Sequence, residues 1–176
     1  MLVGKTMVAV AAMLVVGSAM AEKTAGDVYD DATLAAQVKT NLIDSSDVSA
    51  SDVNVEVEKG VVQLSGFVES EEAREAAGRI AADIIGVKSV SNKLAISGPK
   101  RSFGTTLDDQ MIETKVNAAL MSAEATNAGD IDVDVREGVV QLSGFVSSEA
   151  EKQVATEVAQ GVKGVVRVDN VLDLKD

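Results

Sequence analysis

The chain contains the nine-residue segment GVVQLSGFV twice, at residues 60–68 and again at residues 138–146. The offset of 78 residues continues on both sides without a gap, and it relates Leu42 to Leu120. Self-similarity at a fixed spacing indicates a tandem duplication, so a single structural unit occurs twice. We expect one domain over residues 30–96 and a second over residues 108–174. A linker over residues 97–107 contains the only proline of the chain.

The first part of each repeat has the spacing of a helix. Leu34, Val38 and Leu42 recur every fourth residue, which predicts an apolar stripe on a helix near residues 31–43. The second copy predicts a helix near residues 109–121. An aspartate at position 30 or 31 can accept hydrogen bonds from the first free N–H groups of the first helix.

The middle of each repeat has the spacing of a hairpin. Valines alternate with polar residues over residues 53–58, as expected of a half-buried strand. Gly60 then supplies the positive φ of a short turn. The repeated segment forms the second strand, with Val62, Leu64 and Val68 on one face. Acidic residues at alternate positions 130, 132 and 134 of the second copy are expected to line the solvated face of its strand. They do not form an EF-hand, because the required glycine and glutamate are replaced by valine and glutamine.

The last part of each repeat contains a serine-capped, alanine-rich helix and a final strand. Ser70 and Ser148 precede these helices, and Gly86 and Gly164 are expected to end them. The predicted fold class is therefore α+β: two tandem α-β-β-α-β domains, each a three-stranded mixed sheet covered on one face by two helices. Six glycines are expected to serve the backbone rather than a ligand: Gly60, Gly66, Gly86, Gly138, Gly144 and Gly164.

The N-terminus has the features of an export signal. Residues 1–21 carry one charge, Lys5, then an apolar run, and they end in Ala19-Met20-Ala21. The apolar run is too short to span a membrane. We expect cleavage after Ala21 and release into the periplasm. No cysteine follows that could carry a lipid.

Composition narrows the possible chemistry. The chain has no histidine and no cysteine, so the usual general base, the thiol nucleophile and the preferred zinc ligands are missing. No phosphate-binding glycine motif occurs. The net charge of −12 opposes binding to nucleic acid. We therefore expect no enzyme activity, no metal, no cofactor and no nucleic-acid partner.

The repeat resembles the BON domain of bacterial envelope proteins. The resemblance is carried by the two GVVQLSGFV segments, the serine-capped helices, and the closing segments over residues 86–94 and 164–172. It implies an α-β-β-α-β fold and a role in osmotic and envelope stress at phospholipid interfaces. Some members act as periplasmic chaperones. In a lipoprotein relative, the second of two such domains binds anionic phospholipid.

Two sets of residues are candidates for contact with a lipid or a protein partner. If the relative's mode of binding applies here, Met111, Lys115 and Met121 on the first helix of the second copy are the residues to consider; the alternative is that this stripe is core. Phe67 and Phe145 are expected on the other face of their strands from Val62 and its counterpart. That face is either an outer contact surface, or it is buried beneath a helix or between the domains. The functional hypotheses are contact with phospholipid or envelope proteins under osmotic stress, or a holdase-type chaperone.

Overall fold

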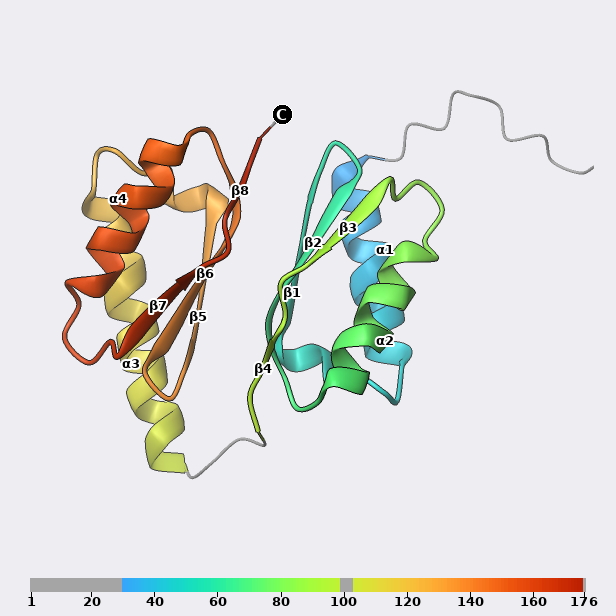
Figure 1. Ribbon diagram of the computed structural model, residues 1–176, viewed down its shortest axis with the longest axis horizontal. Helices are drawn as coiled ribbons and strands as arrows, with labels where there is room; N and C mark the ends of the chain where they lie inside the picture. Colours follow the sequence, from blue (N-terminus) through green and yellow to red (C-terminus); the bar gives the residue numbers. More distant parts are fainter. Residues whose placement is uncertain (1–29, 99–102, 176) are drawn as a thin grey trace, which may run out of the picture.

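The computed structural model describes residues 30–98 and 103–175, which form two similar α+β domains (Figure 1). The expected signal peptide and its cleavage site lie outside these residues. The elements of the first domain are α1 (Asp31–Asp44), η1 (Ala50–Asp52), β1 (Val53–Glu58), β2 (Val61–Val68), α2 (Glu71–Ala82), β3 (Ser89–Asn92) and β4 (Ala95–Ile96). Those of the second domain are α3 (Phe103–Ser122), η2 (Ala128–Asp130), β5 (Ile131–Arg136), β6 (Val139–Val146), α4 (Glu149–Gln160), β7 (Arg167–Asn170) and β8 (Asp173–Leu174).

The strand that contains the repeated segment is the centre of each sheet. In the first domain β2 pairs antiparallel with β1 and parallel with β3 and β4. The short strands β3 and β4 together occupy the place of the expected third strand. They are separated at Leu94, which turns inward and is 3% exposed. The second domain repeats this arrangement with β6 at its centre. The expected mixed sheet is confirmed, with a break in its last strand.

Two adjacent aspartates at the start of the first domain have separate roles. Asp30 caps α1, with its Oδ1 accepting a hydrogen bond from the Ala32 N–H at 3.3 Å. Asp31 accepts from the N–H groups of Lys59 and Gly60 at 2.7 and 2.8 Å, which fixes the β1–β2 turn against the start of the helix. Asp109 makes the same pair of bonds in the second domain. This explains why an aspartate occurs at the same place in both repeats.

Three helix ends differ from the sequence expectation. Helix α3 begins at Phe103, so the last five residues of the segment expected as linker are helical. Helices α2 and α4 end at Ala82 and Gln160, before the glycines expected to end them. A turn follows each helix, and Gly86 and Gly164 lie at its end with φ of 106° and 108°.

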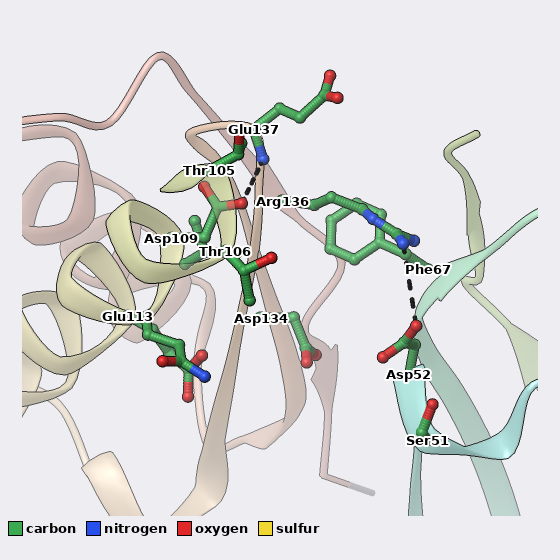
Figure 2. A pocket seen from close by; sticks show the side chains of 12 residues that line it. Ser51, Asp52, Phe67, Thr105, Thr106, Asp109, Glu113, Asp134, Arg136 and Glu137 are labelled. Atoms are coloured by element: carbon green, nitrogen blue, oxygen red, sulfur yellow. Dashed lines mark hydrogen bonds and ion pairs between the residues drawn. The ribbon is translucent and has the colours of Figure 1, made fainter. Parts of the chain in front are cut away.

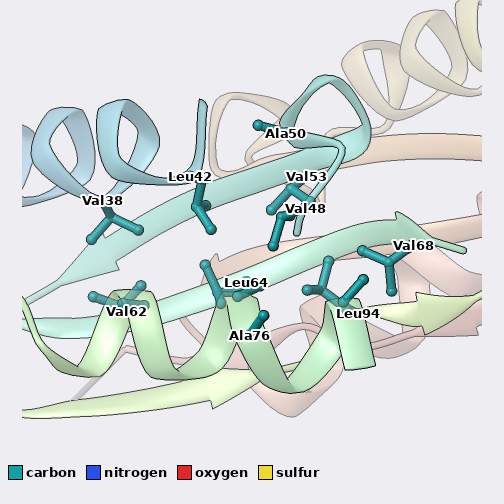
Figure 3. Packing of buried hydrophobic residues seen from close by; sticks show 13 residues of the cluster. Val38, Leu42, Val48, Ala50, Val53, Val62, Leu64, Val68, Ala76 and Leu94 are labelled. Carbon is teal, nitrogen blue, oxygen red and sulfur yellow. The ribbon is translucent and has the colours of Figure 1, made fainter. Parts of the chain in front are cut away.

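The hydrophobic core of each domain lies between its sheet and its two helices. Figure 3 shows the first one, where Val38 and Leu42 of α1 point towards Val62 and Leu64 of β2. Small alanines such as Ala76 allow α2 to lie close to the sheet. Leucines and valines with almost no exposed surface form both cores, and burial of each such side chain contributes about 1.5–3 kcal/mol.

The other face of each sheet is covered by the other domain. In Figure 1 helices α1 and α2 lie outside one sheet and α3 and α4 outside the other, so that the two sheets lie between them. Contacts join β2 with β6 and β1 with β6. Seven of the eight residues of β2 are buried, on both faces of the strand, and the same holds for β6. The two repeats therefore form a helix–sheet–sheet–helix stack.

Candidate functional site

Two glutamines from the repeated segment join the domains. Gln63 and Gln141 are almost fully buried. The Gly144 N–H donates to Gln63 Oε1 at 2.7 Å, and the Gly66 N–H donates to Gln141 Oε1 at 2.5 Å. Because the two hydrogen bonds are related by the 78-residue offset, each repeat presents the same donor and the same acceptor to the other. We call this reciprocal pair of bonds the glutamine clasp.

The amide groups of the same glutamines bind carbonyl oxygens of the opposite domain. Gln141 Nε2 donates to the Lys93 carbonyl at 3.2 Å, and Gln63 Nε2 donates to the Val171 carbonyl at 3.2 Å. Gln63 Nε2 also donates to Asp173 Oδ2 at 2.8 Å. No counterpart of this last bond is available to Gln141, because alanine occupies the equivalent position 95. The clasp is therefore stronger on the side of Gln63.

Glycine at positions 66 and 144, whose N–H groups donate in the clasp, allows the central strand to approach the backbone at the start of the neighbouring strand of its own domain. Gly66 has φ of 101°, and a Cβ there would lie 2.1 Å from the Asp52 carbonyl oxygen. Gly144 has φ of 115° and would place a Cβ 2.2 Å from the Asp130 carbonyl oxygen. A side chain at either position is excluded by backbone atoms that cannot move aside.

The two phenylalanines of the repeated segment are buried at the domain interface. Phe67 is 8% exposed and Phe145 is 7% exposed, so the interpretation of these rings as an outer contact surface is wrong. Figure 2 shows the Arg136 guanidinium over the Phe67 ring, and its centre lies 5.7 Å from the ring centroid. Phe145 instead lines a cavity with Glu58, the residue equivalent to Arg136. The two edges of the interface therefore differ in charge.

Acidic residues of β1 and β5 meet along the interface. Asp134 Oδ2 accepts a hydrogen bond from Asn54 Nδ2 of the other domain at 2.7 Å. Burial raises the pKa of Asp134 to about 7, and the charges of Asp132 and Glu113 add to the effect. Partial burial and the nearby Asp132 also raise the pKa of Glu56 to about 7. The interpretation of these acids as the solvated face of a strand is wrong, because the other domain lies against them.

At the edge of the interface that contains Phe145, the pKa of Asp173 is shifted in the opposite direction. Burial alone would raise the pKa of Asp173, but hydrogen bonds from Gln63 and Ser91 and the Lys93 ammonium together hold that pKa below its usual range. The Lys93 Nζ lies 3.6 Å from Asp173 Oδ1, and Ser91 Oγ donates to Oδ2 at 2.9 Å. This carboxylate therefore stays charged and joins three residues of the first domain.

A cavity of about 260 Å³ lies beside Arg136, between the domains (Figure 2). Phe67 and Asp52 line it from the first domain, and Thr105, Thr106 and Glu113 line it from α3. Arg136 Nη2 lies 3.9 Å from Asp52 Oδ2, so this cation is already paired. The cavity places the inward face of α3 next to the acidic residues of the interface.

The outward face of α3 exposes the other residues predicted from sequence. Met111 is 55% exposed, Met121 is 77% exposed, and Lys115 is also exposed. Met111 and Lys115 line one shallow groove together with Leu107, Gln110 and Thr114, whereas Met121 lies at the far end of the helix. The alternative that this stripe is core is wrong for Met111 and Met121, but it is correct for the neighbouring Ile112 and Val116. The core side of α3 is formed by Ile112, Val116 and Leu120.

The equivalent face of α1 lacks the first of these methionines. Thr33 and Gln37 replace Met111 and Lys115, and small or polar side chains line the groove there. Met121 has an exposed apolar counterpart in Ile43, so the two helices differ at the groove and not at this far end. Helix α3 is also longer, with 20 residues against 14, and its additional N-terminal turns contribute the exposed Leu107. The repeats have therefore diverged on this helix, although their central strands are identical.

The described residues define a tandem pair of α+β domains that join through their sheets and leave an apolar groove exposed on α3. A family model described as the BON domain matches residues 30–98 and 108–176. The chain belongs to the BON domain family, as its sequence indicated.

Three relatives match most of the chain. It is 36% identical to Osmotically-inducible protein Y of Escherichia coli over 151 residues, which is 85% of this chain and 75% of that protein. It is 29% identical to Outer membrane lipoprotein DolP of Haemophilus influenzae, over 88% of this chain and 79% of that protein. It is 31% identical to the 21 kDa hemolysin of Actinobacillus pleuropneumoniae, over 86% and 77% of the two chains. No helix within residues 30–98 and 103–175 is long and apolar enough to cross a membrane.

Proposed function

We propose that this protein is a non-enzymatic component of the bacterial periplasm that helps to maintain the envelope under osmotic stress by contacting phospholipid surfaces. The contact surface is the outward face of α3, with Leu107, Met111, Lys115 and Met121. Similarity to an osmotically inducible protein and to an outer membrane lipoprotein supports the proposed role in the bacterial envelope under osmotic stress. The observation that carries the proposal is the divergence of α3 from α1 at the groove, where α3 exposes Leu107 and Met111 and α1 has Thr33 in place of Met111.

The size of this surface indicates weak and reversible binding. Three apolar side chains that are 46–77% exposed would contribute about 3–4 kcal/mol when they enter the acyl boundary. That free energy corresponds to a dissociation constant on the order of 1 mM. Lasting association would therefore need a high local concentration of lipid, as the periplasm provides.

The charge of α3 sets the character of the contact. Asp108 and Glu113 lie on the same helix as Lys115, and the whole chain carries a net charge of −12. General attraction to an anionic surface is therefore opposed. Apolar insertion supplies the affinity, and Lys115 is positioned to meet a single lipid phosphate.

The same exposed methionines favour a second function, the holding of unfolded envelope proteins. Methionine is flexible and polarisable, and it adapts to partners of irregular shape. An unfolded chain offers many apolar side chains and needs no phosphate contact. A holdase would therefore use Met111 and Met121 without Lys115.

A single tryptophan on α3 would test the proposal, because the chain contains none. We expect the emission of Met111→Trp to shift to shorter wavelength when anionic phospholipid vesicles are added. The matched control is Thr33→Trp, at the equivalent position of α1, whose emission should not change. If vesicles leave both variants unchanged while a reduced, unfolded protein shifts Met111→Trp, the holdase function replaces the lipid function. Equal shifts in both variants would contradict a specific role of α3.

A further inference from the structure

The acidic residues of the interface lie beside the glutamine clasp in the sheet register. Glu56 of β1 is opposite Gln63 of β2, and Asp134 of β5 is opposite Gln141 of β6. Residues opposite each other on neighbouring strands share one face of the sheet. Each glutamine of the clasp therefore has a carboxyl group next to it, on the face that meets the other domain.

Each of these carboxyl groups meets a polar side chain of the opposite domain. Glu56 of the first domain lies within hydrogen-bonding reach of Asp132 of the second. Asp134 of the second domain accepts from Asn54 of the first. The Glu56 and Asp132 carboxylates repel each other when both are charged, whereas a proton shared between them makes the contact attractive.

We propose that the cluster formed by Glu56, Asp132 and Asp134 makes the pairing of the two repeats dependent on pH. The interface is closed when the cluster holds protons, and it loosens at this edge when all three carboxylates are charged. This inference does not depend on a lipid contact, and it concerns how the two domains associate.

The charged groups around the cluster do not neutralise it. Asp134 is faced by Glu113 of α3 and by Asp52 of η1, and Glu56 is faced by Asp130 of η2. The two nearby cations are already paired: Arg136 with Asp52 at 3.9 Å, and Lys175 with Asp130 at 2.8 Å. Protons are therefore the available means of reducing the negative charge between the strands.

The range of the effect follows from the same environment. Burial and the neighbouring acids raise the pKa of both Asp134 and Glu56 to about 7, and an opened interface would return both groups to ordinary values near 4. The closed state then binds more protons than the open state between these limits. Opening becomes more favourable as pH rises from about 4 to 7 and levels off above that range.

Hydrogen exchange of two amides would measure the opening directly. The N–H groups of Gly66 and Gly144 donate across the interface to the clasp glutamines. The Lys88 N–H donates to the Gly60 carbonyl at 2.8 Å inside the first domain and is the internal reference. Between pH 5.5 and 8, we expect the protection factors of Gly66 and Gly144 to fall at least about thirtyfold relative to that of Lys88, which is the effect of one carboxyl group whose pKa changes from about 7 to about 4 on opening.

A double variant and a matched control complete the experiment. Glu56→Gln with Asp134→Asn should remove the pH dependence of both glycine amides. Asp83→Asn, the control, changes an exposed acid next to the end of α2 and should leave the pH dependence of both glycine amides intact. Protection factors of Gly66 and Gly144 that follow Lys88 at every pH in the unmodified protein would overturn the proposal. So would a double variant that folds and keeps the same pH dependence.

Discussion

Replacement of Gln63 by leucine is the sharpest test of how the two repeats are joined. Leucine has a similar volume, so the substitution removes hydrogen bonds without leaving a large cavity. The Gly144 N–H loses its acceptor, and the Val171 carbonyl and Asp173 lose a donor. All of these groups lie between two packed sheets, where water replaces the lost bonds poorly.

The expected cost follows from those bonds. A buried donor left without an acceptor costs about 1–3 kcal/mol. Loss of the bond to the charged Asp173 adds to this, because hydrogen bonds to charged groups contribute about 1.5–3 kcal/mol. We expect Gln63→Leu to lower the free energy of unfolding by about 2–4 kcal/mol in total. Gln141→Leu should cost less, because Gln141 has no bond to a carboxylate.

Urea unfolding followed by circular dichroism would give these free energies. Gln153→Leu is the matched control, since Gln153 lies on the exposed surface of α4, and it should change the free energy by no more than about 0.5 kcal/mol. If Gln63→Leu is as stable as this control, the glutamine clasp does not join the domains in solution. If Gln141→Leu costs more than Gln63→Leu, the role assigned to Asp173 is wrong.

Two further predictions concern the backbone and the pH dependence of stability. Gly66→Ala should destabilise the protein by more than about 3 kcal/mol, because its Cβ would meet the Asp52 carbonyl oxygen; Gly98→Ala, where no atom lies within 4 Å, should be neutral in the same thermal unfolding experiment. The raised pKa of Asp134 contributes stability that is fully present below about pH 4 and is lost as pH rises through about 7. The difference in unfolding temperature between pH 6 and pH 8 should therefore be smaller for Asp134→Asn than for the unmodified protein. An unchanged difference would refute this explanation.

The arrangement within each domain could be predicted from sequence because it depends on local spacing. Leu34, Val38 and Leu42 form the buried stripe of α1, and Val62 and Leu64 face the helices as alternation requires. The start of α3 at Phe103 could not be predicted in this way. Its first turns lie against the interdomain cavity, so they have no apolar stripe of their own.

The pairing of the domains was the part that local spacing could not predict. Gln63 and Ser65 alternate with apolar residues, and this pattern is also that of a strand with one solvated face. The same ambiguity led to the wrong placement of Asp132 and Asp134 in solvent. The useful signal was the identity of the two central segments, polar residues included, since a reciprocal interface uses the same residues twice.

The most direct test of the proposed function is an NMR titration of the unmodified protein with vesicles of anionic and then zwitterionic phospholipid. We expect the amide signals of Met111, Lys115 and Met121 to weaken first with both kinds of lipid, because apolar insertion supplies the affinity, while those of Thr33 and Gln37 on α1 stay unchanged. Signals that weaken equally on α1 and α3, or that remain unchanged at millimolar lipid, would contradict it.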